Sequence, residues 1–322
     1  MHTDQNAAAT RTRSVLHTND IRIQHSQRVT ALAWPPMGAW PNGRRYLASA
    51  DAGGLVLVSD VTQGKVRVHL VHPDEVTALA WSPDTTTLAA ACHDGSVQVW
   101  HTKDWRRGVT YRRHLFRGMP SPVRGVSYTR DGRYLASCGD DQVVRIWDAC
   151  TGETMQCYYR GHHSSIHTLA WSPSGRSIAS GDDQGLVRIW DAATGQTSMT
   201  YRGHSWRVTG LAWSPSGFAI VTSSWDGTVQ LWDAHSGDTF VTYRGHPLAA
   251  HSACKWLGAA YSPGGGRIAS VGECQATQVW DPLTGQRIAT YGARSESART
   301  VAWSPDGRSL ATSDGEQGVR VW

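Results

Sequence analysis

The chain has 322 residues, 40% of them hydrophobic, with a formal net charge of +5 and a pI near 9.0. This mild basic balance, without a basic run that is interleaved with aromatic residues, makes a nucleic-acid partner unexpected. The six cysteines form no Cys-x-x-Cys pair, which fits a reducing compartment, and we expect a cytoplasmic protein. No apolar run is long enough to span a membrane and no signal peptide is recognisable, so no membrane contact is expected.

In chain order, residues 1–13 form a polar segment that is expected to be a flexible tail, and a strand-like segment follows over residues 15–24. One pattern then recurs to residue 322. Each copy has an apolar run ending in Trp-Ser-Pro or a variant of it, a run of small apolar residues, and a run ending in Trp-Asp. The first copy is the most degraded, with Ser59-Asp60 in place of Trp-Asp. The closing positions are 59, 100, 147, 190, 232, 280 and 322, which makes seven copies.

Repeat five shows the expected elements most clearly. Strands are predicted over residues 208–213, 218–223, 228–232 and 238–243, because apolar residues alternate there and Gly, Pro, Asp and Ser lie between the runs. Four antiparallel strands in each repeat make one blade of a propeller. The last repeat stops at Trp322 before a fourth strand. Residues 15–24 are therefore expected to supply the outer strand of blade seven and to cover an open sheet edge.

These repeats resemble the WD-repeat family of Trp-Asp β-propellers over about residues 15–322. Two residues of the repeat carry the resemblance: a histidine near its start, in Gly-His or a variant of it, and a tryptophan at its end. The histidines are His72, His162, His204 and His246. The tryptophans are Trp100, Trp147, Trp190, Trp232, Trp280 and Trp322. The near-identical repeats are similar to those of bacterial members of the family. The resemblance implies an all-β, seven-bladed β-propeller of four-stranded antiparallel blades, closed by the N-terminal strand, with residues 14–322 as one domain. It also implies a non-catalytic protein-interaction scaffold without a cofactor.

Four residues of blade five could be mistaken for a catalytic triad with an added aromatic residue: His204, Thr222, Asp226 and Trp232. The resemblance implies instead a buried hydrogen-bond tetrad that ties the strands of one blade together. The set is expected to be incomplete elsewhere, since Met119 replaces the His in blade three and Gln184 the Asp in blade four. Blade five is then the one complete set. The other His and Cys residues lack a recognised zinc spacing, so no catalytic or metal residue is assigned.

Function is expected in the loops at one end of the ring, the top face, and at the mouth of the central channel, because the strands of a propeller are scaffold. Trp206, Trp225 and Trp256 fall in these loops, and exposed tryptophan is typical of binding hot spots. Two interpretations stay open: the three residues contact a partner, or Trp256 folds its inserted loop over the other two. The residues expected to bind a partner protein or peptide are Trp206, Arg207, Trp225, Lys255, Trp256, Arg124, His167, Arg299, Asp140 and Asp183.

Arg124, His167 and Arg299 are expected to look into the channel mouth, with Asp140 and Asp183 at its rim. Arginine binds carboxylates and phosphates through two parallel hydrogen bonds, so one alternative function is a reader of acidic or phosphorylated peptides through Arg124, Arg207 and Arg299. The opposing interpretation is that these arginines pair internally with the two aspartates. A propeller hydrolase, a further alternative, needs converging carboxylates or a metal at the channel mouth, which the expected Thr, Arg, His and Leu lining does not supply.

Two more insertions are expected. One covers residues 36–45 in blade one and carries Trp40, and the other covers residues 105–114 in blade two and is rich in arginine. The basic stretch could bind an acidic partner, but such stretches are more often solvated edges that discourage pairing between sheets. We expect the propeller itself to be monomeric.

Overall fold

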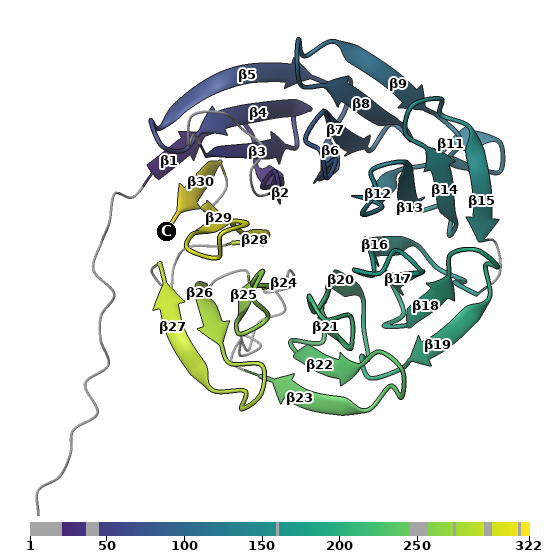
Figure 1. Cartoon of the computed structure of the whole chain (residues 1–322), viewed down its shortest axis with the longest axis vertical. Helices are drawn as coiled ribbons and strands as arrows, with labels where there is room; N and C mark the ends of the chain where they lie inside the picture. The colour runs from purple at the N-terminus through teal and green to yellow at the C-terminus, as the bar shows by residue number, and fades with distance from the viewer. Residues whose placement is uncertain are drawn as a thin grey trace, which may run out of the picture.

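The computed structural model describes residues 21–36, 45–158, 161–244, 257–272, 275–292, 298–314 and 317–322. Seven four-stranded antiparallel sheets stand around a central axis like the blades of a propeller (Figure 1). The described residues form no helix, and thus none that is long and apolar enough to cross a membrane. The prediction of an all-β, seven-bladed propeller is confirmed.

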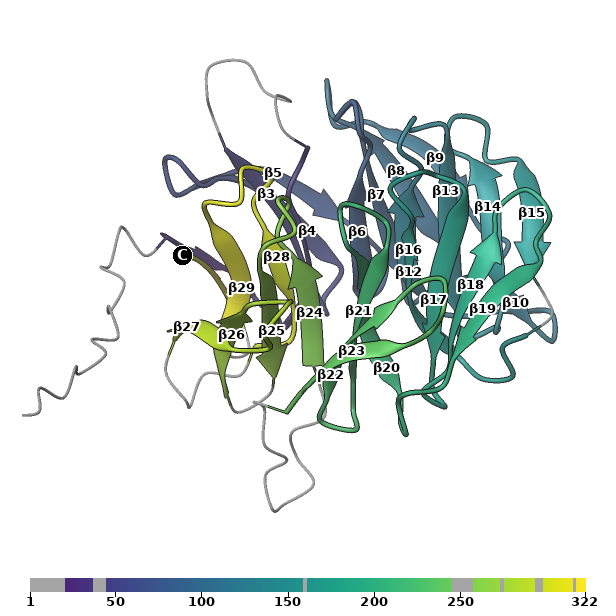
Figure 2. The ribbon, with the colours of Figure 1, turned by 60° about the horizontal axis from the view of Figure 1, so that its bottom comes forward.

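Each blade runs from an innermost strand beside the axis to an outermost strand at the rim (Figures 1 and 2). Blades one to three are β2 (Val29–Ala33), β3 (Tyr46–Asp51), β4 (Leu55–Asp60), β5 (Lys65–Val71); β6 (Val76–Trp81), β7 (Thr87–Cys92), β8 (Val97–His101), β9 (Arg107–Tyr111); and β12 (Val123–Tyr128), β13 (Tyr134–Gly139), β14 (Val144–Asp148), β15 (Thr154–Tyr158). Blades four and five are β16 (Ile166–Trp171), β17 (Ser177–Asp182), β18 (Val187–Asp191), β19 (Thr197–Tyr201); and β20 (Val208–Trp213), β21 (Ala219–Ser224), β22 (Val229–Asp233), β23 (Thr239–Tyr243). Blade six is β24 (Leu257–Tyr261), β25 (Ile268–Gly272), β26 (Gln275–Trp280) and β27 (Arg287–Tyr291).

Blade seven is built from both ends of the described chain. It contains β28 (Val301–Trp303), β29 (Leu310–Asp314), β30 (Gly318–Val321) and β1 (Ile21–Gln24). β1 pairs with β30 in antiparallel register, with Ile21 opposite Val321, and the buried Ile23 packs with Val319. The predicted closure by an N-terminal strand is confirmed, while residues 15–20 of that predicted strand and the predicted tail 1–13 lie outside the described residues.

The indole N–H groups of innermost-strand tryptophans tie neighbouring blades together. They donate to a carbonyl of the preceding blade's innermost strand, at 3.0 to 3.2 Å, in Trp81, Trp171, Trp213 and Trp303. Trp34 makes the same bond to the carbonyl of Ala302, at 3.2 Å, and so links blade one to blade seven. These bonds satisfy a donor that the packing of blades would otherwise leave unpaired.

Outer-strand tyrosines stack on the third-strand tryptophan of the next blade. The rings of Tyr201 and Trp232 lie 4.2 Å apart at an angle of 3°, and those of Tyr111 and Trp147 lie 4.5 Å apart at 1°. The pairs Tyr158–Trp190 and Tyr243–Trp280 repeat the arrangement. The apolar core is thus divided into layers between adjacent blades, and the four layers that contain these pairs are filled by large aromatic side chains.

Blade one has a serine where other blades carry this tryptophan. Ser59 is 0% exposed, and its Oγ has no hydrogen-bond partner among the described residues. Because a buried unpaired polar group costs about 1–3 kcal/mol, Ser59→Ala is expected to raise the free energy of unfolding by about 1 kcal/mol in urea denaturation. The matched change Ser49→Ala removes a hydroxyl 2.7 Å from His25 Nε2 and should lower it. A loss of stability in Ser59→Ala would show that the Ser59 hydroxyl is satisfied.

Candidate functional site

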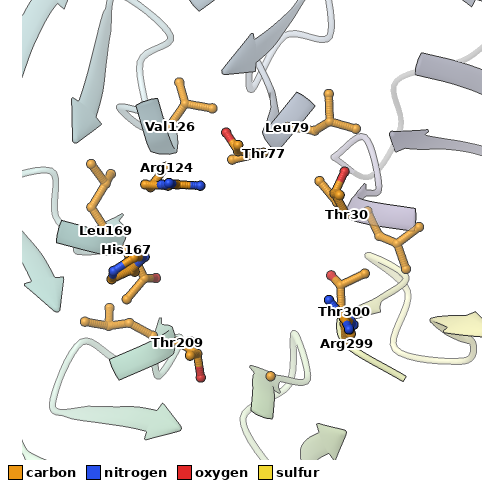
Figure 3. A pocket seen from close by; sticks show the side chains of 18 of the residues that line it. Thr30, Thr77, Leu79, Arg124, Val126, His167, Leu169, Thr209, Arg299 and Thr300 are labelled. Atoms are coloured by element: carbon orange, nitrogen blue, oxygen red, sulfur yellow. The ribbon is translucent and has the colours of Figure 1, made fainter. Parts of the chain in front are cut away.

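A cavity of about 600 Å³ opens on the axis of the ring at the top face, where the loops enter the innermost strands (Figure 3). All seven blades contribute to its wall. Its mouth is polar, with Arg124, His167 and Arg299 directed toward the opening, whereas apolar side chains of the same strands, among them Leu79 and Leu169, line the wall as well. The cavity therefore offers both hydrogen-bonding groups and apolar surface to a ligand.

The threonines around the mouth hold blades to one another. Thr30 Oγ1 donates to the carbonyl of Val76 in the next blade, and Thr77 Oγ1 donates to the carbonyl of Val123 at 2.6 Å. Thr209 Oγ1 donates within its own blade to the carbonyl of Ser223. Since these hydroxyl protons are engaged in the scaffold, a ligand at the mouth would meet the charged side chains rather than free threonine donors.

Arg124 and Asp140 form a two-bond ion pair at the mouth. Arg124 Nε donates to Asp140 Oδ1 at 3.0 Å, and Nη2 donates to Oδ2 at 2.7 Å. Burial alone would raise the pKa of Asp140, but the bonds and charge of Arg124 outweigh it and lower the pKa below its usual value. Both groups are therefore charged at neutral pH, and each neutralises the other.

Asp183 is shared by two partners from neighbouring blades. His167 Nε2 lies 2.8 Å from Asp183 Oδ1, and Arg207 Nε donates to the same oxygen. Burial, followed by the nearby positive charge of Arg207, lowers the pKa of His167 below its usual value. At neutral pH His167 is thus an uncharged donor to Asp183, and the site carries one ion pair, Asp183 with Arg207.

Arg207 also stacks on Trp225, with its guanidinium carbon 4.0 Å from the ring centroid. Trp225 meets Trp206 edge to face at 5.8 Å and 79°, and the carbonyl of Trp206 accepts a hydrogen bond from Ser224 Oγ at 2.9 Å. Trp206 is nevertheless 50% exposed. We call Trp206, Arg207 and Trp225 the tryptophan shelf; it is an ordered aromatic surface that borders the channel mouth.

The sequence analysis missed one member of the mouth. Glu75 Oε1 accepts a hydrogen bond from Arg28 of blade one at 3.1 Å. Arg28, Glu75 and Arg207 each stand immediately before the first residue of an innermost strand. A charged residue at this position of the repeat was therefore a usable signal, because Arg28, Glu75 and Arg207 all line the cavity.

The structure brings most of the predicted site residues to one end of the ring. Seven of them lie at the channel mouth or on the adjoining shelf with direct or shared contacts, namely Arg124, Asp140, His167, Asp183, Trp206, Arg207 and Trp225. Arg299 lines the cavity, and its backbone N–H donates to Ser313 Oγ at 2.8 Å. Lys255 and Trp256 lie outside the described residues. The interpretation that their loop covers the shelf therefore stays a prediction.

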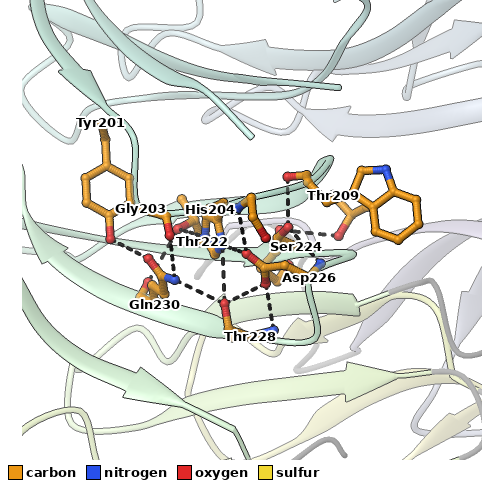
Figure 4. Close-up of polar contacts among 12 residues, drawn as sticks. Tyr201, Gly203, His204, Thr209, Thr222, Ser224, Asp226, Thr228 and Gln230 are labelled. Atoms are coloured by element: carbon orange, nitrogen blue, oxygen red, sulfur yellow. Dashed lines mark hydrogen bonds and ion pairs between the residues drawn. The ribbon is translucent and has the colours of Figure 1, made fainter. Parts of the chain in front are cut away.

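The predicted tetrad of blade five is a connected hydrogen-bond chain (Figure 4). His204 Nδ1 lies 2.8 Å from Asp226 and Nε2 lies 2.8 Å from Thr222 Oγ1, which also accepts a bond from Trp232 Nε1 at 3.2 Å. Burial would raise the pKa of Asp226, but hydrogen bonds from His204 and Thr228 lower it to about 2. The chain is buried between strands and away from the cavity, which fits a structural role.

The expectation that blade five holds the one complete set was wrong for blade three. The histidine there is His114, not the position of Met119: His114 Nδ1 lies 3.1 Å from Asp141 and Nε2 lies 2.7 Å from Ser137 Oγ. Trp147 Nε1 donates to the same serine at 3.1 Å. Extra residues between His114 and the next strand displaced the histidine from its usual spacing.

Blade four is also complete, through a displaced carboxylate. Asp182, the last residue of β17, replaces Gln184 as the partner of His162, with 2.8 Å between Asp182 Oδ2 and His162 Nδ1. Its other oxygen accepts hydrogen bonds from the backbone N–H groups of Gln184 and Leu186, and so holds the turn. Asp51 pairs with His25 in blade one in the same way.

The predicted insertion over residues 105–114 was also misplaced. β9 is an ordinary outer strand, and Trp105 packs edge to face on Trp81 at 6.2 Å. The additional residues are a two-stranded hairpin formed by β10 (Leu115–Phe116) and β11 (Met119–Pro120). The predicted insertion over residues 36–45 lies almost wholly outside the described residues, Trp40 included.

The family model for the WD domain, G-beta repeat, matches residues 64–101, 110–148, 153–191, 195–233 and 285–322. The chain belongs to the WD-repeat family. Proteins of this family are typically protein-interaction scaffolds and generally have no enzymatic activity. The closing segment of blade one falls outside the matched ranges, and that segment is where Ser59 stands in place of the tryptophan.

Several named proteins are similar to parts of the chain. The F-box-like/WD repeat-containing protein TBL1X of Mus musculus is 35% identical over 82 residues, which are 26% of this chain and 14% of that protein. The COMPASS component SWD3 of Saccharomyces cerevisiae is 31% identical over 118 residues, 36% of this chain and 35% of that protein. The probable cytosolic iron-sulfur protein assembly protein 1 of Candida glabrata is 27% identical over 134 residues, 38% of each. The chain thus spans well under half the length of these relatives.

Proposed function

We propose that this chain is a non-catalytic scaffold that binds a partner protein or peptide at its top face, through the tryptophan shelf and the mouth of the channel. The observation that carries the proposal is a half-exposed Trp206 on a fixed support. One relative, SWD3, is named as a component of COMPASS, which agrees with a role in binding other proteins. Membership of the WD-repeat family supports the scaffold class, and the top face is our own assignment.

The shelf suits binding because its side chains are ordered before a partner arrives. The Trp206 side chain is supported by the edge contact with Trp225, and its backbone carbonyl is held by Ser224 Oγ, so less conformational entropy remains to be lost on binding. Contacts continue from Trp225 through Arg207 to Asp183 in the channel mouth. A peptide lying along this path would meet aromatic surface first, then neutralised ion pairs, and then the apolar wall of the cavity.

Recognition of phosphate is not what this geometry favours. Arg124 is held by Asp140, and Arg207 is held by Asp183 and stacked on Trp225. A phosphorylated peptide would have to compete with carboxylates that already occupy these guanidinium groups. The internal pairing therefore supports a ligand chosen by apolar contact and hydrogen bonds over the alternative of an acidic-peptide reader.

The test compares wild type with Trp206→Ala in affinity capture from a lysate of the source organism, quantified by mass spectrometry, followed by titration of the captured protein in purified form. Loss of a hot-spot tryptophan costs about 2 kcal/mol or more, so the dissociation constant should rise about thirtyfold. Leu283→Ala is the matched control, because Leu283 is 89% exposed in a turn at the opposite end of the ring. Equal affinity of Trp206→Ala and wild type would contradict the proposed face.

A further inference from the structure

The β10–β11 hairpin is an addition to blade three. In the blades where both ends are described, four positions separate the tetrad histidine from the innermost strand, as from His162 to Ile166, whereas nine separate His114 from Val123. The added residues form a tight two-residue turn at Arg117 and Gly118, whose φ angles are 51° and 83°. Positive φ at both turn positions is the geometry that matches the twist of a short hairpin, and it is unfavourable for arginine.

Both faces of this hairpin are apolar and exposed. Phe116 lies opposite Met119, and Leu115 lies opposite Pro120, so one pair belongs to each face of the ribbon. Leu115 is 45% exposed, Phe116 44% and Met119 69%. An isolated two-stranded hairpin gains little stability in water, and three large apolar side chains at its tip are not explained by the packing of the propeller.

The base of the hairpin is rigid. The backbone N–H of Ser121 donates to the carbonyl of His114 at 3.0 Å and closes the hairpin. His114 itself is fully buried in the tetrad with Asp141 and Ser137. The apolar tip is therefore mounted on one of the most firmly bonded points of the blade, as expected of a surface that must stay in one position.

The hairpin segment itself carries positive charge. Residues 112–121 contain three arginines and no acidic residue. The side chain of Arg112 is 62% exposed and reaches Asp94 at 3.4 Å, a surface pair of small energetic value. Arg113 and Arg117 are exposed as well, and the Arg117 guanidinium lies 5.5 Å from the centroid of the Phe116 ring.

We infer that the β10–β11 hairpin inserts into an anionic lipid surface, with its apolar tip among the headgroups and Arg112, Arg113 and Arg117 against lipid phosphate or carboxylate groups. A groove on a protein would cover one face of the ribbon, whereas lipid surrounds both, and both are apolar. The unpaired strand edges limit the hairpin to the interfacial region, where water still reaches the backbone. Such a peripheral contact needs no spanning segment, so the sequence-based expectation of no membrane contact did not address it.

The experiment is sedimentation of the protein with vesicles of phosphatidylcholine, with and without phosphatidylserine. Wild type should bind the phosphatidylserine vesicles and be released by salt. The double change Phe116→Ser with Met119→Ser should weaken binding about tenfold or more, because it removes the apolar insertion. Arg112→Gln with Arg113→Gln should weaken binding to phosphatidylserine vesicles by about thirtyfold, since each arginine near the surface contributes about 1 kcal/mol.

Phe240→Ser is the matched control. Phe240 is 56% exposed on β23, and Ser198 occupies the same position in blade four, so the change should leave both fold and vesicle binding intact. Thermal unfolding checks that each variant keeps the propeller fold.

Absence of wild-type binding to both kinds of vesicle would overturn the inference, and so would binding of the hairpin double variant that equals wild-type binding. Loss of capture of a protein partner by the hairpin variant without any vesicle binding would likewise overturn it, in favour of a protein acceptor. Trp206→Ala should bind vesicles like wild type, which separates this site from the shelf.

Discussion

Asp141→Asn is expected to lower the free energy of unfolding by about 3–5 kcal/mol, as when one partner of a buried ion pair is removed. Asp141 has a side chain that is 0% exposed and accepts hydrogen bonds from His114 and from Arg145. Arg145 is only 5% exposed, so the substitution would leave a buried guanidinium without its carboxylate. Urea denaturation followed by tryptophan fluorescence measures the loss.

Asp226→Asn in blade five is the matched control. The position of Arg145 is held there by Gln230, as the strand register shows, and no buried positive charge is left behind. The expected loss is therefore the smaller cost of weakened hydrogen bonds to a charged group, about 1.5–3 kcal/mol. Asp141→Asn combined with Arg145→Gln should recover part of the loss. Equal losses in the two single variants would mean that the buried arginine does not set the cost.

Trp232→Ala is expected to destabilise the chain by about 3–5 kcal/mol. Trp232 is 0% exposed, stacks on Tyr201 of the preceding blade and donates to Thr222, so its removal opens a cavity between two blades and breaks the tetrad. Thermal unfolding followed by circular dichroism measures the effect without depending on tryptophan fluorescence.

Trp206→Ala serves as the comparison within the same blade. Because Trp206 is 50% exposed and lies on a loop, its removal should change stability by no more than about 0.5 kcal/mol. The two tryptophans thus separate a structural effect from a binding effect. A large loss of stability in Trp206→Ala would instead identify the shelf as part of the core and weaken its use as a binding surface.

The repeat made the architecture predictable. Seven closing positions fix seven blades, and a last repeat without a fourth strand requires the N-terminal segment to complete it, which β1 does. The channel-facing positions could be found in the same way, because Thr30, Thr77 and Arg124 recur at one distance before the last aromatic residue of the innermost strand. Periodicity therefore carries information wherever the copies keep their length.

The same reasoning failed where a repeat has a different length, or where a nearby residue takes the place of the expected tetrad residue. Counting back a fixed distance from the innermost strand reached Met119, because the hairpin separates His114 from that strand. Counting forward reached Gln184, although Asp182 performs its role from two positions earlier. The partners of Arg124 and Arg207 depend on side-chain reach and on the spacing of blades, which a sequence pattern does not contain.

The pairing of β1 with β30 also sets the order in which this molecule can be completed. At about 5–20 residues per second, roughly 15–60 s of synthesis separate Ile21 from Val321. During that time β1 has no partner, and the growing ring is an open arc that exposes unpaired strand edges and the apolar faces that later meet between blades seven and one. A chain cut short before β30 would keep these surfaces open to other nascent chains or to chaperones. The ring can therefore close, and cover these surfaces, only after β30 has been synthesised.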